Sequence, residues 1–299
     1  SDVYKRQAME AGIAPGDRIL AINGQTVSML TLSNVLKKME GRAGERVSLT
    51  LYRKKMQKEF EVTVLRRAIR ESSVPTAQLL HSQQALGLKA GYLYLSEFTA
   101  ASHGEVEAAL YDLEDRGMKS LLLDLRGNPG GLLTAAVSLL GEFLPPSTEV
   151  VFTRGRNPQH NSPPMKTPDR RRRERGYPIA VLLDRHSASA SELVAGALQD
   201  LERAIIVGEK SYGKGSVQRI MPMGNTALRL TIATYHTPSG RSPQDKGVIP
   251  DIEVDFSVED QANLEKQRRH DSLTAGEKKG LKFWVDPVIT AALEELSGR

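Results

Sequence analysis

The stretch L-L-L-D-L-R-G-N-P-G-G-L, residues 121–132, decides the fold class. Its first half is a run of leucines interrupted only by Asp124, which is typical of a strand that is covered on both faces. Its second half contains three glycines, which let backbone N–H groups approach a ligand closely where a strand turns into a helix. We therefore expect a buried strand, a tight turn and then a helix over about 132–144.

The same alternation continues on both sides of this stretch. Further strands are predicted by apolar or alternating runs at 91–98, 150–152, 179–183, 205–207 and 226–235, and further helices at 104–116 and 191–201. Repeated strand–helix units predict an α/β core. After this core, we expect residues 257–299 to form a charged tail with a terminal helix at about 286–296. Before it, residues 68–90 are predicted to be a linker, since they are charged and then rich in Ser, Thr and Gln.

The first 67 residues have a different organisation. They contain a predicted strand, a helix and two further strands, at 18–24, 31–39, 47–51 and 60–64. The string A-G-I-A-P-G-D-R-I-L-A-I-N-G, residues 11–24, resembles PDZ domains and ends in an Asn-Gly turn. The resemblance implies an α+β PDZ module at 1–67 that lacks its N-terminal strand and its carboxylate-binding loop. We expect this module to pack normally but to have an incomplete peptide groove.

Composition limits the chemistry that this chain can perform. Its 299 residues fit two domains, and none of them is a cysteine. The absence of cysteine excludes disulfides, a thiol nucleophile, Cys-ligated zinc and Cys-ligated iron–sulfur clusters. No two of the six histidines have the spacing of a helical metal site, so we expect neither a metal nor another cofactor. The chemistry must then use hydroxyls, carboxylates, amines and backbone amides.

The charge distribution argues against nucleic acid as a partner. The net charge of +5 is a mild excess. Four consecutive arginines at 170–173 have no interleaved aromatic residues that could stack on bases, so we interpret 153–177 as a solvated loop and leave the role of 170–175 open. No run of about 18 apolar residues occurs, so we expect no integral membrane segment.

A serine-rich turn follows the predicted strand at 179–183. It reads H-S-A-S-A-S-E, residues 186–192, and a helix is expected to begin at once. Ser189 and Glu192 have the spacing of a capping box, so Ser189 could be only a helix N-cap. The same turn would hold the Ser189 hydroxyl exposed and leave the N–H of Ala190 free to donate to an oxyanion. The G-x-S-x-G motif of α/β-hydrolases is absent.

A glycine-rich segment at 208–218, G-E-K-S-Y-G-K-G-S-V-Q, nearly matches a phosphate-binding Walker A loop. The match fails at Gly215, where Mg²⁺ binding requires a hydroxyl, and strands rather than a helix are predicted to follow. We therefore reject a nucleotide site.

Five motifs in a fixed order resemble the carboxy-terminal processing peptidases, also called tail-specific proteases. They are D-L-R-G-N-P-G-G, S-A-S-A-S-E, V-G-E-x-x-x-G-K-G-x-V-Q, Y-x-T-P-S-G-R and G-V-I-P-D, and the resemblance covers about residues 8–256. It implies a crotonase-like αβ peptidase core at 68–256 and a Ser–Lys dyad. Carried over residue by residue, it makes Ser189 the nucleophile, Lys214 the base 25 residues further on, and Gln218 the residue that supports the lysine.

The oxyanion hole implied by the resemblance combines the N–H of Ala190 with a glycine N–H. We favour Gly131 over Gly130 for this role, but the sequence does not separate the two.

A lysine acts as a base only when it is neutral near about pH 7, and burial disfavours its charged form, so we expect Lys214 to lie buried beside apolar groups. It would take the proton of Ser189 and return it to the leaving amine.

The expected function is a serine endopeptidase that cleaves protein substrates near their C-terminal tails through an acyl-enzyme intermediate. Its partners would be proteins or peptides with accessible C-terminal tails. The sequence does not decide whether the chain forms a homo-oligomer. The resemblance also implies export, to the periplasm or outside the cell, with membrane association left open.

Two alternative functions stay open. One is a catalytically silent, PDZ-containing peptide-binding protein, and the other is acyl-CoA chemistry on the crotonase-like core.

Among other polar residues, we expect His186 to be structural and His236 to line the site, because a triad needs side chains that are assembled in space. Glu97 could approach the cleft.

Overall fold

The computed structural model describes residues 11–14, 16–66 (backbone only at 55), 72–80, 87–169, 173, 175–224, 226–268, 273, 278, 280–281 and 284–298. The chain divides into two compact units, Ser1–Glu71 and Ser72–Arg299. Residues 170–172 of the arginine run, residue 67 of the predicted PDZ module and residues 68–71 and 81–86 of the predicted linker lie outside the described residues.

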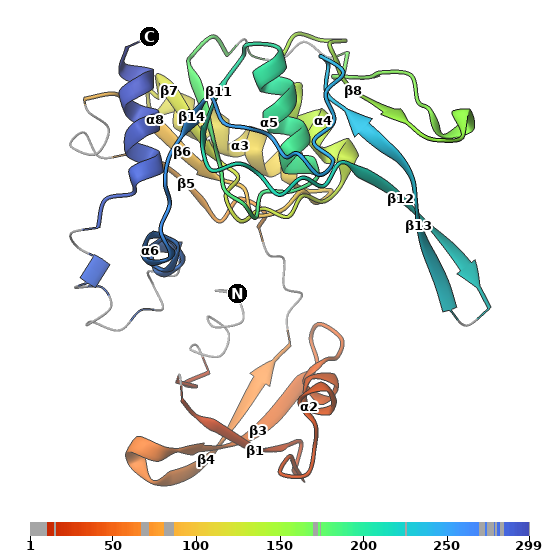
Figure 1. Cartoon of the computed structure of the whole chain (residues 1–299). Helices are drawn as coiled ribbons and strands as arrows, with labels where there is room; N and C mark the ends of the chain where they lie inside the picture. Colours follow the sequence, from red (N-terminus) through yellow and green to blue (C-terminus); the bar gives the residue numbers. More distant parts are fainter. Residues whose placement is uncertain are drawn as a thin grey trace. The chain divides into compact units, whose positions relative to one another are not determined.

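The described residues of the first unit form a small antiparallel sheet and the helix α2 (Figure 1). Its order is β2-β1-β3-β4, and its elements are β1 Arg18–Ile22, β2 Gln25–Thr26, α2 Leu32–Met39, β3 Arg46–Arg53, a 3₁₀ turn at Lys54–Met56, and β4 Lys58–Leu65. Asn23 and Gly24 both have positive φ and join β1 to β2, which confirms the predicted Asn-Gly turn. Alternate residues of β3 face inward, so the core consists of Ile22, Val47, Leu49 and Leu51.

The second unit is built on a six-stranded sheet in the order β14-β11-β10-β7-β6-β5. Neighbouring strands are parallel except β5, which is antiparallel to β6. The strands are β5 Thr76–Leu79, β6 Ala90–Tyr94, β7 Ser120–Asp124, β10 Ile179–Leu183, β11 Ile205–Gly208 and β14 Ile252–Glu253. β5 lies inside the predicted linker, so that prediction is wrong at these residues, which pair with β6 instead.

Helices cover both faces of this sheet (Figure 1). α3 Ser102–Asp115, α4 Leu133–Leu140 and α5 Ala190–Asp200 lie on one face, and α6 Val258–Arg268 and α8 Pro287–Ser297 lie on the other. Leu121 and Leu123 face the first group, whereas Leu122 faces the second, and all three are fully buried. This confirms that the leucine run is a strand covered on both faces. The second face of the sheet is covered by α6 and α8, which lie in the region expected to be a charged tail.

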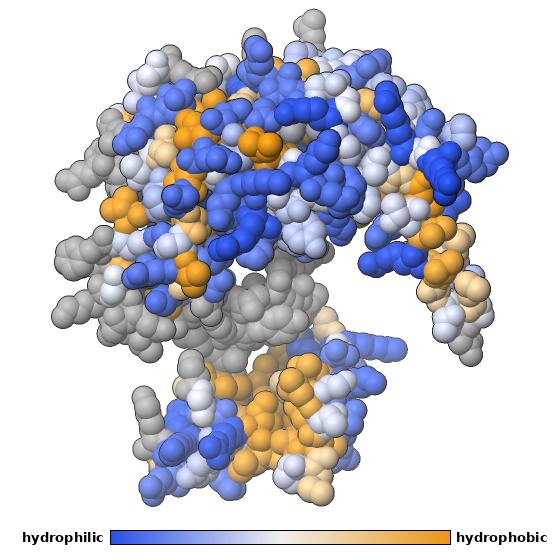
Figure 2. All heavy atoms as spheres, in the orientation of Figure 1, coloured by the Kyte–Doolittle hydropathy of each residue, from blue (hydrophilic) through white to orange (hydrophobic). Residues whose placement is uncertain are grey.

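A second sheet of the same unit has the order β12-β13-β8-β9. Its strands are β8 Glu149–Arg154, β9 Met165–Lys166, β12 Ser216–Met223 and β13 Thr226–His236, and a 3₁₀ turn at Pro158–His160 follows β8. β12 and β13 form a long hairpin that projects from the rest of the unit (Figure 1). Ile220 and Met223 of this hairpin are exposed, and Figure 2 shows apolar surface along it. None of the described helices is both long enough and apolar enough to cross a bilayer.

Candidate active site

The turn between β10 and α5 holds Ser189 in a conformation that residues with side chains rarely adopt. Its φ is 57° and its ψ is −112°, and α5 begins at the next residue. A non-glycine residue in such a conformation stores about 1–3 kcal/mol of strain, which persists only where the surroundings enforce it. The turn thereby presents a half-buried hydroxyl at the N-terminus of a helix, although no G-x-S-x-G motif is present.

Glu192 connects this turn to the segment that carries Lys214. Its fully buried carboxylate accepts hydrogen bonds from the backbone N–H groups of Ser189 and Lys214, both at 2.8 Å. It also accepts from the N–H of Gly213 and the hydroxyl of Ser211, both at 2.6 Å. These four donors and the N-terminus of α5 stabilise its negative charge. The sequence indicated only a capping role for Glu192, because the other three partners lie 19, 21 and 22 residues away.

The turn after β7 packs directly on the turn that holds Ser189. Gly130 has a φ of +99°, and a Cβ placed on it would lie 2.7 Å from the Cβ of Ser189. Gly131 has a φ of +141°, and a Cβ placed there would collide with the carbonyl oxygen of Phe98. Both positions therefore require glycine, and the absence of side chains brings this backbone against Ser189.

Two backbone N–H groups in these turns, those of Ala190 and Gly131, have no acceptor among the described residues. The N–H of Gly130 instead donates to Asn128 Oδ1 at 2.8 Å. Of the glycine pair, Gly131 is thus the residue whose N–H can still donate to a ligand. Free backbone donors beside a serine hydroxyl are what an oxyanion hole requires.

Buried side chains join the two turns. The Ser191 hydroxyl donates a hydrogen bond to the backbone carbonyl of Asn128 at 3.0 Å. Asp184 Oδ1 accepts from the N–H groups of Gly127 and Ser187, both at 2.9 Å. Because β7 and β10 are parallel neighbours, the ends that carry these turns lie at one edge of the sheet. Sequence reasoning missed Asn128 and Asp184, since their partners lie 63 and 57 residues away.

Lys214 and Gln218 lie outside this packed region. Lys214 is exposed in the loop between β11 and β12, and Gln218 is exposed on β12 beside a bulge. Among the described residues, no hydrogen bond joins Lys214 Nζ to Ser189 Oγ or to Gln218. The expectation of a buried Lys214 is therefore wrong, since this residue is exposed in the loop that precedes β12.

The other polar residues considered in the sequence are two histidines and a glutamate. His236 stacks on Phe152 with ring centroids 5.3 Å apart. Both of its ring nitrogens have partners, the Thr234 hydroxyl at 3.1 Å and the Gly240 carbonyl at 3.0 Å, which gives the ring a structural role. His186 and Glu97 are exposed.

A strained serine at a helix N-terminus, beside backbone donors that find no acceptor in the described part of the chain, is the arrangement that serine hydrolases use. The chain belongs to peptidase family S41, whose family model matches residues 89–254. A PDZ domain model matches residues 7–53. These matches confirm the predicted resemblance, the mixed α/β class and, at the level of the family, the serine-type peptidase.

Several relatives are carboxy-terminal processing proteases. One of these, from Bartonella bacilliformis, is 40% identical over 264 residues, which are 85% of this chain and 57% of the relative. Another, from a Synechocystis species, is 37% identical over 279 residues, which are 90% of this chain and 63% of the relative. The solved structure of a photosystem II D1 C-terminal processing protease has a TM-score of 0.55 and 28% identity, and the match covers 83% of this chain and 65% of that one. This chain thus spans less than two thirds of each of them.

Proposed function

We propose that this chain is the catalytic part of a serine endopeptidase that cleaves protein substrates near their C-terminal tails. The observation that carries the proposal is the position of Ser189, on a strained turn whose next N–H, that of Ala190, lacks an acceptor among the described residues. The family and the names of the two relatives support the substrate class.

The reaction begins when Ser189 Oγ attacks the carbonyl carbon of the scissile peptide. Lys214, with a neutral amine, takes the hydroxyl proton, and the N–H groups of Ala190 and Gly131 donate to the oxygen on which negative charge develops. When the C–N bond breaks, Lys214 gives the proton to the leaving amine, and an acyl ester stays on Ser189. Water then hydrolyses the ester and restores the free hydroxyl.

Lys214 has to approach Ser189 for this step. Its backbone is anchored to Glu192, which also holds Ser189, so the lysine side chain has to reorient while its backbone stays in place. A substrate that lies over the exposed amine would displace water from it and favour the neutral form that a base requires. Gln218 would orient this amine with its carbonyl oxygen without adding a negative charge.

The proposal also assigns the parts of the chain. Residues 1–67 form a partial PDZ module, 68–256 the peptidase core and 257–299 a C-terminal segment with the terminal helix. The resemblance to carboxy-terminal processing peptidases further supports export of the protein and recognition of accessible C-terminal tails.

The test compares Ser189→Ala and Lys214→Ala with the wild-type chain on an unfolded protein that has an apolar C-terminal tail. Both substitutions are expected to abolish hydrolysis while circular dichroism shows an unchanged fold. Lys210→Ala, at another exposed lysine of the same loop, is the control and should keep wild-type activity. Full activity in Ser189→Ala or in Lys214→Ala would contradict the proposed dyad.

A fluorophosphonate probe separates the peptidase from a catalytically silent peptide-binding protein. Labelling requires an activated hydroxyl, so the wild-type chain should be labelled at Ser189 and Ser189→Ala should not. A folded wild-type chain that stays unlabelled would favour the binding protein. Turnover of an acyl-CoA thioester would favour chemistry of the crotonase type.

A further inference from the structure

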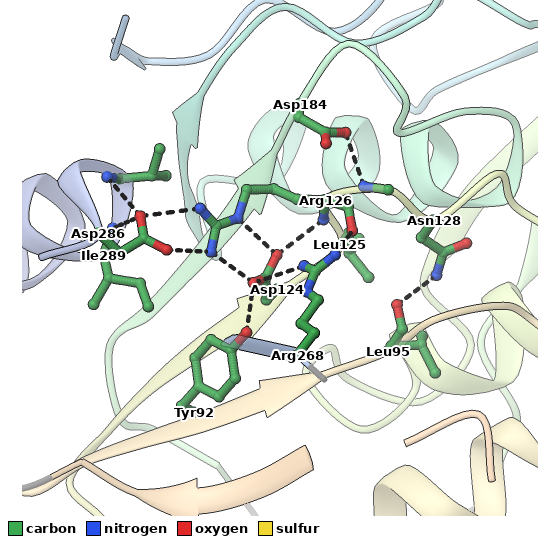
Figure 3. A network of polar contacts seen from close by, with 12 residues as sticks. Tyr92, Leu95, Asp124, Leu125, Arg126, Asn128, Asp184, Arg268, Asp286 and Ile289 are labelled. Carbon is green, nitrogen blue, oxygen red and sulfur yellow. Dashed lines mark hydrogen bonds and ion pairs between the residues drawn. The ribbon is translucent and has the colours of Figure 1, made fainter. Parts of the chain in front are cut away.

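Two charged side chains from the C-terminal segment reach the turn that bears the glycine pair. They are Asp286, the N-cap of α8, and Arg268, the last residue of α6. Both lie beyond residue 254, where the match to peptidase family S41 ends. Figure 3 shows them converging on Asp124 and Arg126, at the end of β7 and the start of the turn.

The guanidinium of Arg126 lies between two carboxylates and is fully buried. Its Nη1 and Nη2 donate to the two oxygens of Asp286 at 3.0 and 2.8 Å. Its Nε and Nη2 donate to the two oxygens of Asp124 at 3.0 and 2.8 Å. Two bidentate pairs fix the plane of the guanidinium and, through it, the position of Arg126 in the turn.

Arg268 closes the other side of this network. Its Nη1 donates to the backbone carbonyl of Arg126 at 3.0 Å, and its Nη2 donates to Asp124 at 3.1 Å. Its guanidinium carbon lies 3.7 Å from the centre of the Tyr94 ring, which is a cation–π contact. A Cβ placed on Gly127 would lie 3.3 Å from Arg268 Nη1, so the arginine packs directly on the turn.

Charge within the network is balanced, since two arginines face two aspartates. Burial by itself disfavours the charged form of Asp124, but Arg126 and Arg268 outweigh this effect and hold the pKa of the carboxyl well below its usual range. The hydroxyl of Tyr92 adds a hydrogen bond to Asp124 at 2.6 Å. Removal of the Asp286 charge would leave Arg126 buried with only one counter-charge, which is unfavourable in a packed interior.

We propose that Asp286 and Arg268 are positioning residues for the oxyanion hole of the peptidase. The inference rests on the proposed function. The two residues hold Arg126 and Gly127 at the start of the turn, and the N–H of Gly131 follows four residues later. A displacement of about 1 Å at this N–H would slow the reaction by about 100-fold. The C-terminal segment outside the family match is then part of the catalytic apparatus.

The first test is Asp286→Asn, which separates helix capping from ion pairing. Asparagine can still accept from the N–H groups of Val288 and Ile289, as Asp286 does at 3.0 and 3.3 Å, but it brings no charge to Arg126. We expect kcat to fall about 10- to 100-fold and KM to stay within about threefold. Glu294→Gln, at an exposed position of the same helix, is the control and should keep both constants.

Affinity for a transition-state analogue distinguishes a positioning role from a merely structural one. A peptide boronate forms a tetrahedral adduct with Ser189 and places an oxygen in the oxyanion hole, whereas a product peptide forms no adduct. Affinity for the boronate should fall by about the same factor as kcat in Asp286→Asn, and affinity for the product peptide should not change. Arg268→Gln, at a side chain that is 18% exposed, should show the same pattern, and Arg268→Lys should retain part of the activity.

An unchanged kcat in folded Asp286→Asn and Arg268→Gln would overturn the inference. Equal losses of affinity for the boronate and the product peptide would overturn it too. If Asp286→Asn does not fold, Arg268→Gln decides. A wild-type chain that neither hydrolyses the tail nor is labelled at Ser189 would instead overturn the proposed function.

Discussion

The backbone N–H of Lys214 donates to the carboxylate of Glu192 at 2.8 Å. The same oxygen, Oε2, accepts a hydrogen bond from the N–H of Ser189. One buried residue therefore holds the two segments that a Ser–Lys reaction has to bring together. The contact anchors the backbone of the lysine and leaves its side chain free to move.

Replacing Glu192 with Gln tests this connection. An amide has one acceptor oxygen instead of two, so at least one of the four donors loses its partner. Each buried unsatisfied donor costs about 1–3 kcal/mol, and we expect the free energy of unfolding to fall by roughly 2–4 kcal/mol in chemical denaturation. We expect kcat to fall at least about tenfold, because Ser189 and Lys214 lose their shared anchor. Glu259→Gln, exposed at the start of α6, is the control, and equal effects of the two substitutions would contradict this role of Glu192.

Gly131→Ala is expected to remove activity and to destabilise the fold. A Cβ at this positive φ collides with a backbone carbonyl, that of Phe98, which cannot move as a side chain can. We expect a loss of about 1–3 kcal/mol in the free energy of unfolding, with hydrolysis below detection. Gly104→Ala is the control, since a Cβ on this exposed helical glycine meets no atom within 4 Å, and it should raise stability by roughly 0.5–1 kcal/mol. Wild-type activity in folded Gly131→Ala would exclude Gly131 from the oxyanion hole.

Ser189→Gly should increase stability and abolish activity together. Glycine adopts a φ of 57° without strain, so thermal unfolding should show a gain of about 1 kcal/mol. Ser187→Ala should instead lower stability and leave the reactivity of Ser189 intact. It removes a fully buried hydroxyl that donates to the Leu125 carbonyl at 2.9 Å, and it should lower stability by about 1–2 kcal/mol while Ser189 is still labelled. Comparable losses of stability in both variants would show that the turn at Ser189 is not strained.

Resistance to acid should depend on Asp124. Its pKa in the folded protein is held well below the usual range, so the unfolded chain takes up a proton first as the pH falls. The network therefore stabilises the fold fully above the ordinary pKa of about 4, and this stabilisation is lost as the pH falls from there toward the folded pKa. Denaturation between about pH 2 and 7 should show the free energy of unfolding decreasing below about pH 4, with a smaller slope in Asp124→Asn. Identical slopes in the two proteins would argue against Asp124 as the titrating group.

Local sequence patterns were sufficient to predict much of the fold. The leucine run before Asp124 and the Asn23–Gly24 turn depend on periodicity and on backbone preferences over a few residues, and both occur as predicted. The strand-to-helix turn at Ser189 is also readable, because small residues follow a buried strand directly.

The rest of the candidate site depends on contacts that no local pattern contains. Asp184 and Asn128 contact the turn of a neighbouring strand, and Asp286 reaches Arg126 from a helix at the far end of the chain. Lys214 is exposed in the loop between β11 and β12. A lysine between two glycines carries no local signal of whether its side chain is covered.

The ion pair between Arg126 and Asp286 spans 160 residues of the chain. A ribosome releases the N-terminal part first, at about 5–20 residues per second, so β7 and its glycine turn emerge roughly 8–30 s before α8 begins. Throughout that interval Arg126 lacks one of its two carboxylates, and its burial is unfavourable. Under the role proposed for Asp286, the contacts that position the oxyanion hole are complete only after residue 286 has emerged.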